Sequence, residues 1–249
     1  MTASIAGLWR HPIKSHGREA LDRITLTAGQ TLPGDRLWAV AHERSDATGS
    51  EWVHCGHFSR GAKLPGLMAI NARLDDTTDR VTLQHPALGE LTLNPDTEGD
   101  KLIEWTRPLV ESNDRLASSR VIRAQTRGMT DTTFASVSLG NLSTHRAVAQ
   151  KLGRDDLSEK RWRINIWLDG LAPWEEFDWM GRELQIGGAK LVVRERIERC
   201  MATTANPETG KRDADTLAAL QSWGHQDMGM YAEVTETGEV AMGDEVKVL

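Results

Sequence analysis

Residues 199–204 hold the side chains whose types and order could do chemistry together. Arg199 directly precedes Cys200, and a neighbouring cation favours the thiolate, the form of cysteine that binds metals and acts as a nucleophile. Thr203 and Thr204 follow closely and, like Arg199, could donate hydrogen bonds to an anion beside the sulfur. The alternative is that Cys200 is a buried thiol that packs as a small apolar side chain. The residue types alone leave both open.

Other segments pair cations with hydroxyl or amide groups, which are the donors that bind anions. Lys14 and Ser15 follow a proline that restricts the backbone. Arg36 follows a Gly-Asp pair, and the planar fork of its guanidinium matches a phosphate. Arg163 and Asn165 alternate with apolar residues, so a strand would place both on one face. The ordinary alternatives are a solvated lysine, a local Asp–Arg pair and outward-facing strand residues.

These motifs together resemble the MOSC family, which is named after the C-terminal domain of molybdenum cofactor sulfurases. The family signature is Arg-Cys, a short hydrophobic pair, Thr-Thr and Asp-Pro-x-Thr-Gly, and residues 199–210 follow it closely. Asn206 stands where an acidic residue is usual, and it also supports a turn before proline. Glu198 stands where a small residue is frequent, and its charge opposes that of Arg199. The resemblance extends to proteins like the mitochondrial amidoxime-reducing component and covers almost the whole chain.

The resemblance implies a site for the molybdenum cofactor (molybdopterin), with Cys200 as the sulfur ligand of molybdenum and the catalytic residue. The implied cofactor contacts are Lys14, Ser15, Arg36, Ser136, Ser138, Arg163, Asn165, Arg199, Thr203 and Tyr231. The first three of them would hold the phosphate of the pterin. Ser138 is also a good helix N-cap candidate, and a lone tyrosine in a strand is usually a packing residue. The phosphate anchors and Cys200 come from opposite halves of the chain, so we expect the site to lie between the halves.

The activity implied by the resemblance is the reduction of small N-hydroxylated or N-oxide substrates by a molybdenum-dependent oxidoreductase. The electrons would come from a separate flavin or iron–sulfur protein, because a [2Fe–2S] cluster needs four Cys or His ligands at particular spacings and the chain has two cysteines. Two alternatives stay open. The protein could transfer sulfur through a persulfide on Cys200, or it could carry the cofactor without catalysis.

The composition excludes several other classes of protein. The 249 residues carry a net charge of −6, which predicts no general nucleic-acid binding. No apolar run is long enough for a membrane span, no secretory signal begins the sequence, and two cysteines fit a reducing compartment, so we expect a cytoplasmic protein. His54, Cys55 and His57 lie close together, but without a second ligand pair they do not complete a tetrahedral zinc site.

The elements that must position these residues are mainly short strands separated by turn residues. A helix is expected after Ser138, ending at Gly153, and a second one over Asp213–Trp223. The expected strands are Ile5–Trp9, Ile24–Thr27, Leu37–Ala41, Leu67–Leu74, Arg80–Leu83, Glu90–Leu93, Leu102–Trp105, Arg163–Leu168, Glu183–Ile186, Leu191–Arg194, Met230–Val234 and Glu245–Leu249. We therefore predict an α+β, mostly β fold. The resemblance makes residues 1–110 an N-terminal β-barrel-like domain and residues 111–249 a mixed β-barrel MOSC domain.

Overall fold

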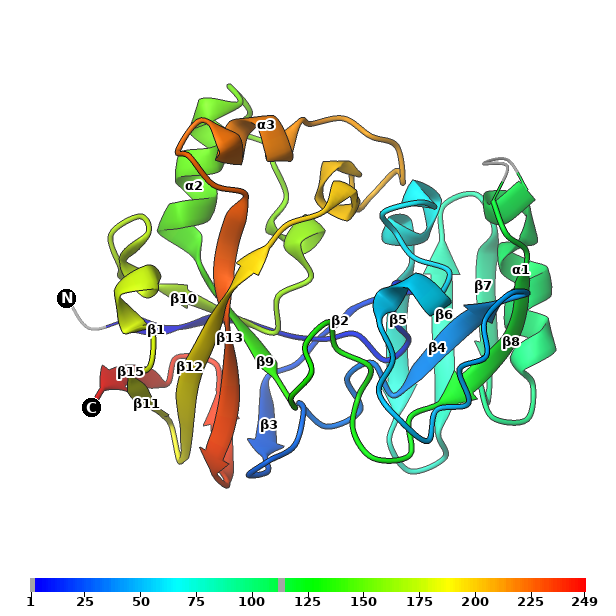
Figure 1. The fold of residues 1–249 in the computed structure, drawn as a ribbon, viewed down its shortest axis with the longest axis horizontal. Helices are drawn as coiled ribbons and strands as arrows, with labels where there is room; N and C mark the ends of the chain where they lie inside the picture. Colours follow the sequence, from blue (N-terminus) through cyan, green and yellow to red (C-terminus); the bar gives the residue numbers. More distant parts are fainter. Residues whose placement is uncertain (1–2, 112–114) are drawn as a thin grey trace.

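Seven strands close into a β-barrel, seen at the left of Figure 1. The computed structural model describes residues 3–111 and 115–249. The barrel order is β10-β9-β13-β12-β11-β15-β1, and β1 pairs back with β10. Only β9 and β10 run parallel, and the other pairs are antiparallel. The strands are β1 (Ala3–Arg10), β9 (Val137–Asn141), β10 (Ile166–Asp169), β11 (Glu183–Ile186), β12 (Ala189–Glu198), β13 (Asp227–Glu236) and β15 (Glu245–Val248).

Apolar side chains from every barrel strand meet inside the barrel, because alternate residues of a strand point to the same face. The buried members include Ile5, Leu139, Ile166, Leu184, Leu191, Met230 and Val246. Closure leaves no unpaired edge except where β2 (Glu19–Ala20) extends β1. The paired strands and their apolar core therefore hold the loops at the strand ends in fixed positions.

A second region, which we call the N-terminal region, lies at the right of Figure 1 and is built mainly from residues 37–111 and 115–123. It contains an antiparallel pair and a three-stranded antiparallel meander, with a helix packed beside them. Its own apolar cluster includes Ile13, Trp38, Leu67, Leu83 and Leu102. The elements are β4 (Trp38–His42), β8 (Ser118–Arg123), β5 (Asn71–Asp75), β6 (Arg80–His85), β7 (Gly89–Leu93) and α1 (Gly99–Glu111).

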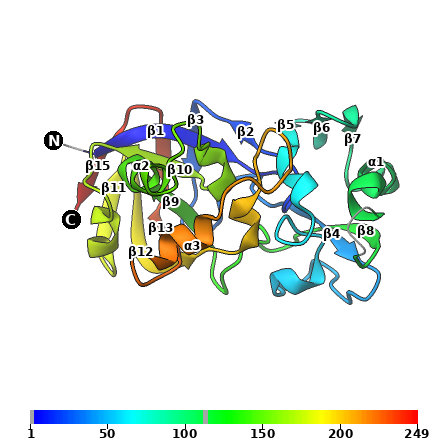
Figure 2. The same cartoon turned by 90° about the horizontal axis from the view of Figure 1, so that it is seen from above.

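Two short helices cover one side of the barrel, as the view from above shows (Figure 2). Asn141 caps α2 by accepting a hydrogen bond from the Ser143 backbone N–H, and Asp215 caps α3 in the same way. The remaining elements are α2 (Leu142–Lys151), α3 (Thr216–Gln221), the pair β3 (Arg23–Leu26) with β14 (Gly238–Ala241), and the 3₁₀ turns η1 (Cys55–His57), η2 (Pro65–Ala69), η3 (Glu159–Trp162), η4 (Glu175–Trp179) and η5 (Met201–Thr204).

The α+β, mostly β fold class is confirmed, but some expected elements are wrong. The expected strand Leu102–Trp105 lies in helix α1, where Leu102, Thr106 and Val110 are buried at a helical spacing. A run of only four residues is too short to show whether its apolar side chains follow the helix period of about 3.6 residues or the strand period of about two. The expected strand Leu67–Leu74 begins only at Asn71, because a proline starts the preceding 3₁₀ turn.

Two further expectations near the site are also wrong. Ser138 lies inside β9 and is not a helix cap, because α2 begins at Leu142. Arg163 ends the 3₁₀ turn η3 in a left-handed conformation, with φ of 52°, so it does not share a strand face with Asn165. Gly153, with φ of 63°, does follow the end of α2 as expected. The division into residues 1–110 and 111–249 stays a prediction.

In the part of the chain that the structure describes, no helix is both long and apolar enough to cross a bilayer.

Candidate functional site

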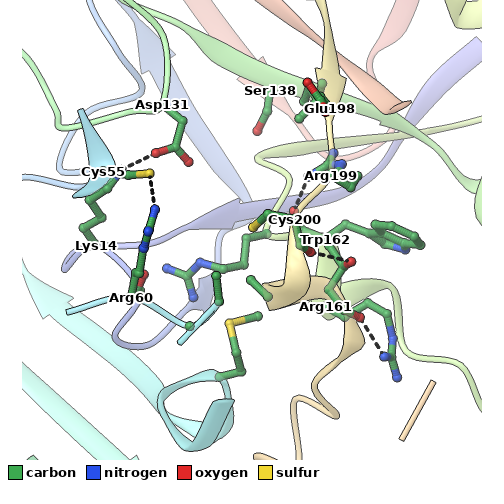
Figure 3. A pocket seen from close by; sticks show the side chains of 18 of the residues that line it. Lys14, Cys55, Arg60, Asp131, Ser138, Arg161, Trp162, Glu198, Arg199 and Cys200 are labelled. Carbon is green, nitrogen blue, oxygen red and sulfur yellow. Dashed lines mark hydrogen bonds and ion pairs between the residues drawn. The ribbon is translucent and has the colours of Figure 1, made fainter. Parts of the chain in front are cut away.

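A cavity of about 230 Å³ lies between the barrel and the N-terminal region (Figure 3). We call its lining residues from residues 137–249 the barrel wall, and those from residues 55–68 the N-terminal wall. The barrel wall consists of Ser138, Arg161, Trp162, Arg163, Ile197, Glu198, Arg199, Cys200, Ala202, Thr203 and Tyr231. The N-terminal wall consists of Cys55, Arg60, Gly61, Ala62 and Met68, and Lys14, Ser15, Arg36 and Asp131 come from loops that connect the two regions.

Cys200 lies where strand β12 turns into η5, and its side chain is exposed to the cavity. The strand ends with a hydrogen bond from the Arg199 N–H to the Gln226 carbonyl. The Cys200 carbonyl then accepts from the Thr203 N–H at 3.1 Å and from the Thr203 hydroxyl at 3.0 Å. The Thr204 hydroxyl donates to the Met201 carbonyl at 2.9 Å. The two threonines therefore fold the turn that presents the thiol, and their hydroxyls are not aimed at an external anion.

Three arginines fix this turn to the rest of the molecule. Arg161, which is 1% exposed, donates to the Thr203 carbonyl at 2.9 Å. Arg18 donates to the Pro207 carbonyl at 2.9 Å, and Arg212 donates to the Ala62 carbonyl at 2.8 Å. Because Arg18 also donates to the Met68 and Ile70 carbonyls, the last two links join the turn to the N-terminal region.

Lys14 is buried at the bottom of the cavity, with 4% of its surface exposed. Its ammonium donates to the Met129 carbonyl at 2.7 Å and to Asp131 Oδ1 at 2.6 Å. An ammonium has three N–H donors, so one stays available to a ligand. The charges of Lys14, Arg36 and Arg163 hold the pKa of Asp131, whose side chain is half exposed, below its ordinary value.

Arg36 is held by the buried carboxylate that precedes it. Its guanidinium forms an ion pair with Asp35 and donates to the Arg163 carbonyl at 3.0 Å. Asp35 Oδ1 also accepts from the His11 N–H at 2.7 Å. Although burial favours the protonated form, Arg36 and His11 hold the pKa of Asp35 well below its usual range. The Asp35 carboxylate therefore holds both the Arg36 guanidinium and the His11 backbone in place.

Arg163 and Arg199 bring two more guanidinium groups to the barrel wall. Burial, together with the charges of Arg36 and Arg18, lowers the pKa of Arg163 to about 9. Burial lowers the pKa of Arg199 to about 10. Arg199 donates to the Met228 and Trp162 carbonyls, so its hydrogen bonds are directed to the backbone and not to the thiol. Arg163 donates to the Gly17 carbonyl at 3.1 Å, while its buried Nη2 has no partner.

Tyr231 and Ser138 face each other across the pairing of β13 and β9, and both line the cavity. Burial raises the pKa of Tyr231 to about 12, so its phenol keeps its proton at neutral pH. The Ser138 hydroxyl donates to Asn165 Oδ1 at 2.7 Å, and Asn165 Nδ2 donates to the Trp9 carbonyl at 3.1 Å. These two strands therefore present one phenol and one hydroxyl in a fixed arrangement.

Unusual backbone conformations concentrate at this cavity. In the described chain, five residues other than glycine have positive φ. Three of the five line the cavity: Ser15, Arg36 and Arg163, with φ of 64°, 52° and 52°. This conformation costs about 1 kcal/mol or more for a residue with a Cβ. Strain of this kind persists where the surrounding structure enforces it, and it is typical of ligand sites.

Most of the expected site residues line this one cavity, and two do not. Ser136 is 1% exposed and its hydroxyl bonds to Thr132 Oγ1 at 2.8 Å. Asn165 is 1% exposed and links Ser138 to β1. The residues that do line it are Lys14, Ser15, Arg36, Ser138, Arg163, Arg199, Cys200, Thr203 and Tyr231.

Sequence reasoning missed several lining residues. Asp131, Arg60 and Met68 belong to no recognised motif, and only their proximity in the fold brings them here. The sequence left Lys14 open as a solvated lysine; once the structure shows it to be buried, a partner such as Asp131 is required nearby. Cys55 also lines the cavity, and its sulfur accepts a hydrogen bond from Arg60 Nη1 at 2.9 Å.

The histidines beside Cys55 have different partners. His54 Nε2 lies 3.7 Å from Cys55 Sγ, and its Nδ1 accepts from the Gly56 N–H at 3.1 Å, whereas His57 Nδ1 lies 3.2 Å from Asp46. Within the described residues, no group of three or more His, Cys, Asp or Glu side chains is arranged to hold a metal ion.

Two family profiles match the chain and together cover almost all of it. A family profile described as the MOSC N-terminal beta barrel domain matches residues 2–150, and the MOSC domain profile matches residues 130–247. Mitochondrial amidoxime reducing component 2 of Bos taurus is 23% identical over 291 residues, which cover 98% of this chain and 82% of that protein. Among solved structures, the YuaD protein of Bacillus subtilis has a TM-score of 0.48 and 14% identity, covering 100% of this chain and 96% of that one. YiiM of Geobacillus stearothermophilus has a TM-score of 0.37 and 18% identity, covering 45% of this chain and 53% of its own.

Proposed function

The chain belongs to the MOSC family, which is associated with the molybdenum cofactor, and on this basis we propose that its cavity binds that cofactor with Cys200 as the sulfur ligand of molybdenum. One observation carries the proposal. An exposed thiol shares a single cavity with the Lys14, Ser15 and Arg36 side chains that the family motif assigns to the pterin's phosphate. Soft transition-metal centres prefer thiolate ligands, and we extend this preference to molybdenum.

The charge of the cavity fits an anionic group. Arg163 Nη2 is buried without a partner, and a buried donor left unpaired costs about 1–3 kcal/mol. The lowered pKa values of Arg163 and Arg199, about 9 and about 10, have burial as their main cause. An anion bound beside these guanidinium groups would supply both the missing acceptor and the missing negative charge. A phosphate group meets both needs.

The strained backbone supports the same conclusion. Ser15 and Arg36, expected phosphate anchors, and Arg163 each adopt positive φ at the cavity. A fold that enforces this conformation at three lining residues holds their side chains in preset positions before any ligand binds. Preset donors bind an anion more tightly, because the ordering cost does not fall on the binding step.

We propose further that the protein is an oxidoreductase that reduces N-hydroxylated or N-oxide substrates. Two electrons and two protons are consumed: the N–O bond breaks, the nitrogen keeps the electron pair, and the oxygen leaves as water. In an N-hydroxyl substrate one added proton goes to the nitrogen and one to the oxygen, whereas in an N-oxide both go to the oxygen. The cofactor supplies the two electrons when bound, and a separate flavin or iron–sulfur protein restores them. The Tyr231 hydroxyl keeps its proton, since burial raises its pKa to about 12, and lines the cavity as a hydrogen-bond donor.

The named relative supports this substrate class. Its name describes a component that reduces amidoximes, and an amidoxime carries an N-hydroxyl group. The word component also fits a protein that works with an electron-donating partner.

The proposal is tested by purifying the protein from a host that makes the cofactor and measuring molybdenum and released pterin. We expect close to one of each per folded chain. Folded protein that holds zinc or no metal, from a host shown to load another molybdenum enzyme, would contradict the proposal.

Sulfur transfer is the second candidate function, because the Cys200 side chain is exposed and a persulfide on it could be reached by an acceptor. Such a carrier does not need the phosphate anchors. Sulfur transfer that survives Lys14→Ala in cofactor-free protein would favour this function over the reductase.

A further inference from the structure

The N-terminal wall of the cavity has no role in the site described so far. Its side chains are a cysteine, an arginine and small or apolar groups, namely Cys55, Arg60, Ala62 and Met68, with Gly61 between them. The family motifs assign no cofactor contact to any of them. The wall faces the same cavity as Cys200, as Figure 3 shows, so it borders the space that a substrate would occupy beside the thiol.

Arg60 differs from Lys14 and Arg199 in the kind of atom that accepts its hydrogen bond. Within the described residues its guanidinium makes one hydrogen bond, to Cys55 Sγ at 2.9 Å (Figure 3). Sulfur is a weak acceptor, and a guanidinium has five N–H donors, so most of the Arg60 donors stay available. Lys14 and Arg199, by contrast, each donate to oxygen acceptors at 2.6–2.8 Å.

The backbone beside Arg60 is held close to the thiol. A Cβ added at Gly61 would lie 2.6 Å from Met68 Sδ and 3.7 Å from Ala202 Cβ, and Ala202 is the second residue after Cys200. The Arg212 guanidinium donates to the Ala62 carbonyl at 2.8 Å and also to the Met201 carbonyl at 2.5 Å. This clamp fixes the position of Arg60 relative to the turn that carries the thiol.

We propose that Arg60 is the recognition site for an anionic group of the substrate, with Cys55 as the residue that positions its guanidinium. This inference rests on the proposed function: the N-hydroxyl group would reach the cofactor beside Cys200 while a carboxylate or phosphate on the same molecule binds Arg60. A guanidinium fork binds either oxyanion in a bidentate way. Met68 and Ala62 provide an apolar surface for the carbon skeleton between the two groups.

The test uses cofactor-loaded protein and three compounds: a neutral aryl amidoxime, and the same amidoxime with a carboxylate or a phosphate at the far end of the ring. The quantity compared is kcat/KM for each anionic compound divided by kcat/KM for the neutral one. We expect the wild type to prefer one anionic compound, and the preferred one identifies the substrate class. A wild type that prefers neither would overturn the proposal.

Arg60→Ala should lower this ratio roughly ten- to a hundredfold, mainly through KM, because it removes a charge-assisted hydrogen bond. Arg60→Lys should recover part of the ratio, since an ammonium keeps the charge but not the fork. Lys63→Ala is the matched control, because it removes one positive charge from the same segment at an exposed side chain that does not line the cavity. Its ratio should equal that of the wild type.

Cys55 variants test the positioning role. Cys55→Ala should lower the ratio by a smaller factor than Arg60→Ala, and Cys55→Ser should recover it, because a hydroxyl can accept from the guanidinium. The unfolding midpoints of the two variants are measured alongside. If Cys55 has only a structural role, then two variants with equal midpoints should also have equal ratios.

Molybdenum content distinguishes the ways in which the inference can fail. A loaded Arg60→Ala protein with an unchanged ratio overturns the anion site and leaves the proposed function intact. If both Arg60→Ala and Arg60→Lys lose molybdenum, Arg60 holds the cofactor, and this result also overturns the proposed substrate-anion site. A wild type without molybdenum contradicts the proposed function itself, and the inference with it.

Discussion

The two walls of the cavity hold their charged groups in different ways. On the barrel wall, Arg163 and Arg199 are tied to backbone carbonyls, and burial lowers the pKa of each. On the N-terminal wall, Arg60 is half-buried and held by one sulfur atom. A buried, fixed set of cations suits a group that stays bound, whereas a loosely held cation suits a ligand that comes and goes. The comparison therefore supports our two proposals: that the cofactor binds between the barrel wall and the anchors Lys14, Ser15 and Arg36, and that the substrate contacts the N-terminal wall.

The largest expected effect comes from the two cysteines, one on each wall. Cys200→Ala should lower reductase activity with an artificial electron donor by at least about a hundredfold, the loss expected for an essential group. Cys55→Ala should keep activity on a neutral substrate well above that of Cys200→Ala. Steady-state rates normalised to folded protein provide the comparison, and equal activity of Cys200→Ala and the wild type would exclude Cys200 as the metal ligand.

The phosphate anchors should separate cofactor binding from stability. Lys14→Ala should lower cofactor content roughly ten- to a hundredfold, because it removes a charge-assisted donor. It should change the free energy of unfolding of the cofactor-free protein by only about 1 kcal/mol, since the Asp131 side chain that it leaves is 52% exposed.

Arg36→Ala should lose cofactor as well, but it should also destabilise the cofactor-free protein by about 3–5 kcal/mol, because it leaves the fully buried Asp35 carboxylate without its ion-pair partner. The double variant Asp35→Asn with Arg36→Ala should recover part of this loss in urea unfolding. Equal unfolding free energies for Lys14→Ala and Arg36→Ala would show that the ion pair between Asp35 and Arg36 does not stabilise the fold.

Stability of the cofactor-free protein should depend on pH through two histidines of the anchor loop. Burial lowers the pKa of His11 to about 3 and that of His16 to about 4, while in the unfolded chain both lie near 6.5. Below pH 6.5 the unfolded state binds protons that the folded state does not, so stability falls as the pH falls toward these folded values. The slope is about 1.4 kcal/mol per pH unit for each histidine.

Urea unfolding between pH 7 and pH 5 measures this slope. His11→Asn, which keeps a donor for Asp35, should lower the slope by about 1.4 kcal/mol per pH unit or less, and the rest comes from His16, His85 and His145, whose pKa values burial also lowers. A slope that is unchanged in this variant would mean that His11 titrates normally in the folded protein.

The smallest expected effect tests the departure from the family signature. Asn206 Nδ2 donates to Asp213 Oδ2 at 2.9 Å, so the asparagine is matched to a carboxylate beside the turn. Asn206→Asp should therefore destabilise the protein by about 1–2 kcal/mol at pH 7, and less near pH 4, where carboxylates take up protons. Equal thermal unfolding of this variant and the wild type at both pH values would argue against the pairing.

The parts of the site that the sequence could predict are those that local chemistry determines. Lys14, Ser15 and Arg36 lie in short turns with characteristic residues, and Cys200 follows its signature, so the resemblance of these motifs to the family was enough to expect them at one site, and they do line one cavity. The closing turn before Pro207 could be predicted for the same reason, because Asn206 makes the expected turn contact to the Glu208 N–H at 2.8 Å.

The rest could not be predicted because it depends on contacts between distant residues. The barrel closes only when β1 pairs with β10 and β15, which follow it by more than 150 residues. Arg163 leaves the expected strand because η3 ends in a left-handed residue, and no alternation pattern indicates that. Asp131 and Arg60 reach the cavity through this long-range packing alone, and their own sequence neighbours give no signal of it.

The most direct test of the central claim is X-ray absorption at the molybdenum edge, comparing the wild type with Cys200→Ser loaded in the same host. If Cys200 is the metal ligand, the serine variant should show one sulfur neighbour fewer at molybdenum and one oxygen neighbour more. The same number of sulfur neighbours in both proteins would contradict the account, because molybdenum would then be bound without the thiol on which the barrel wall is centred.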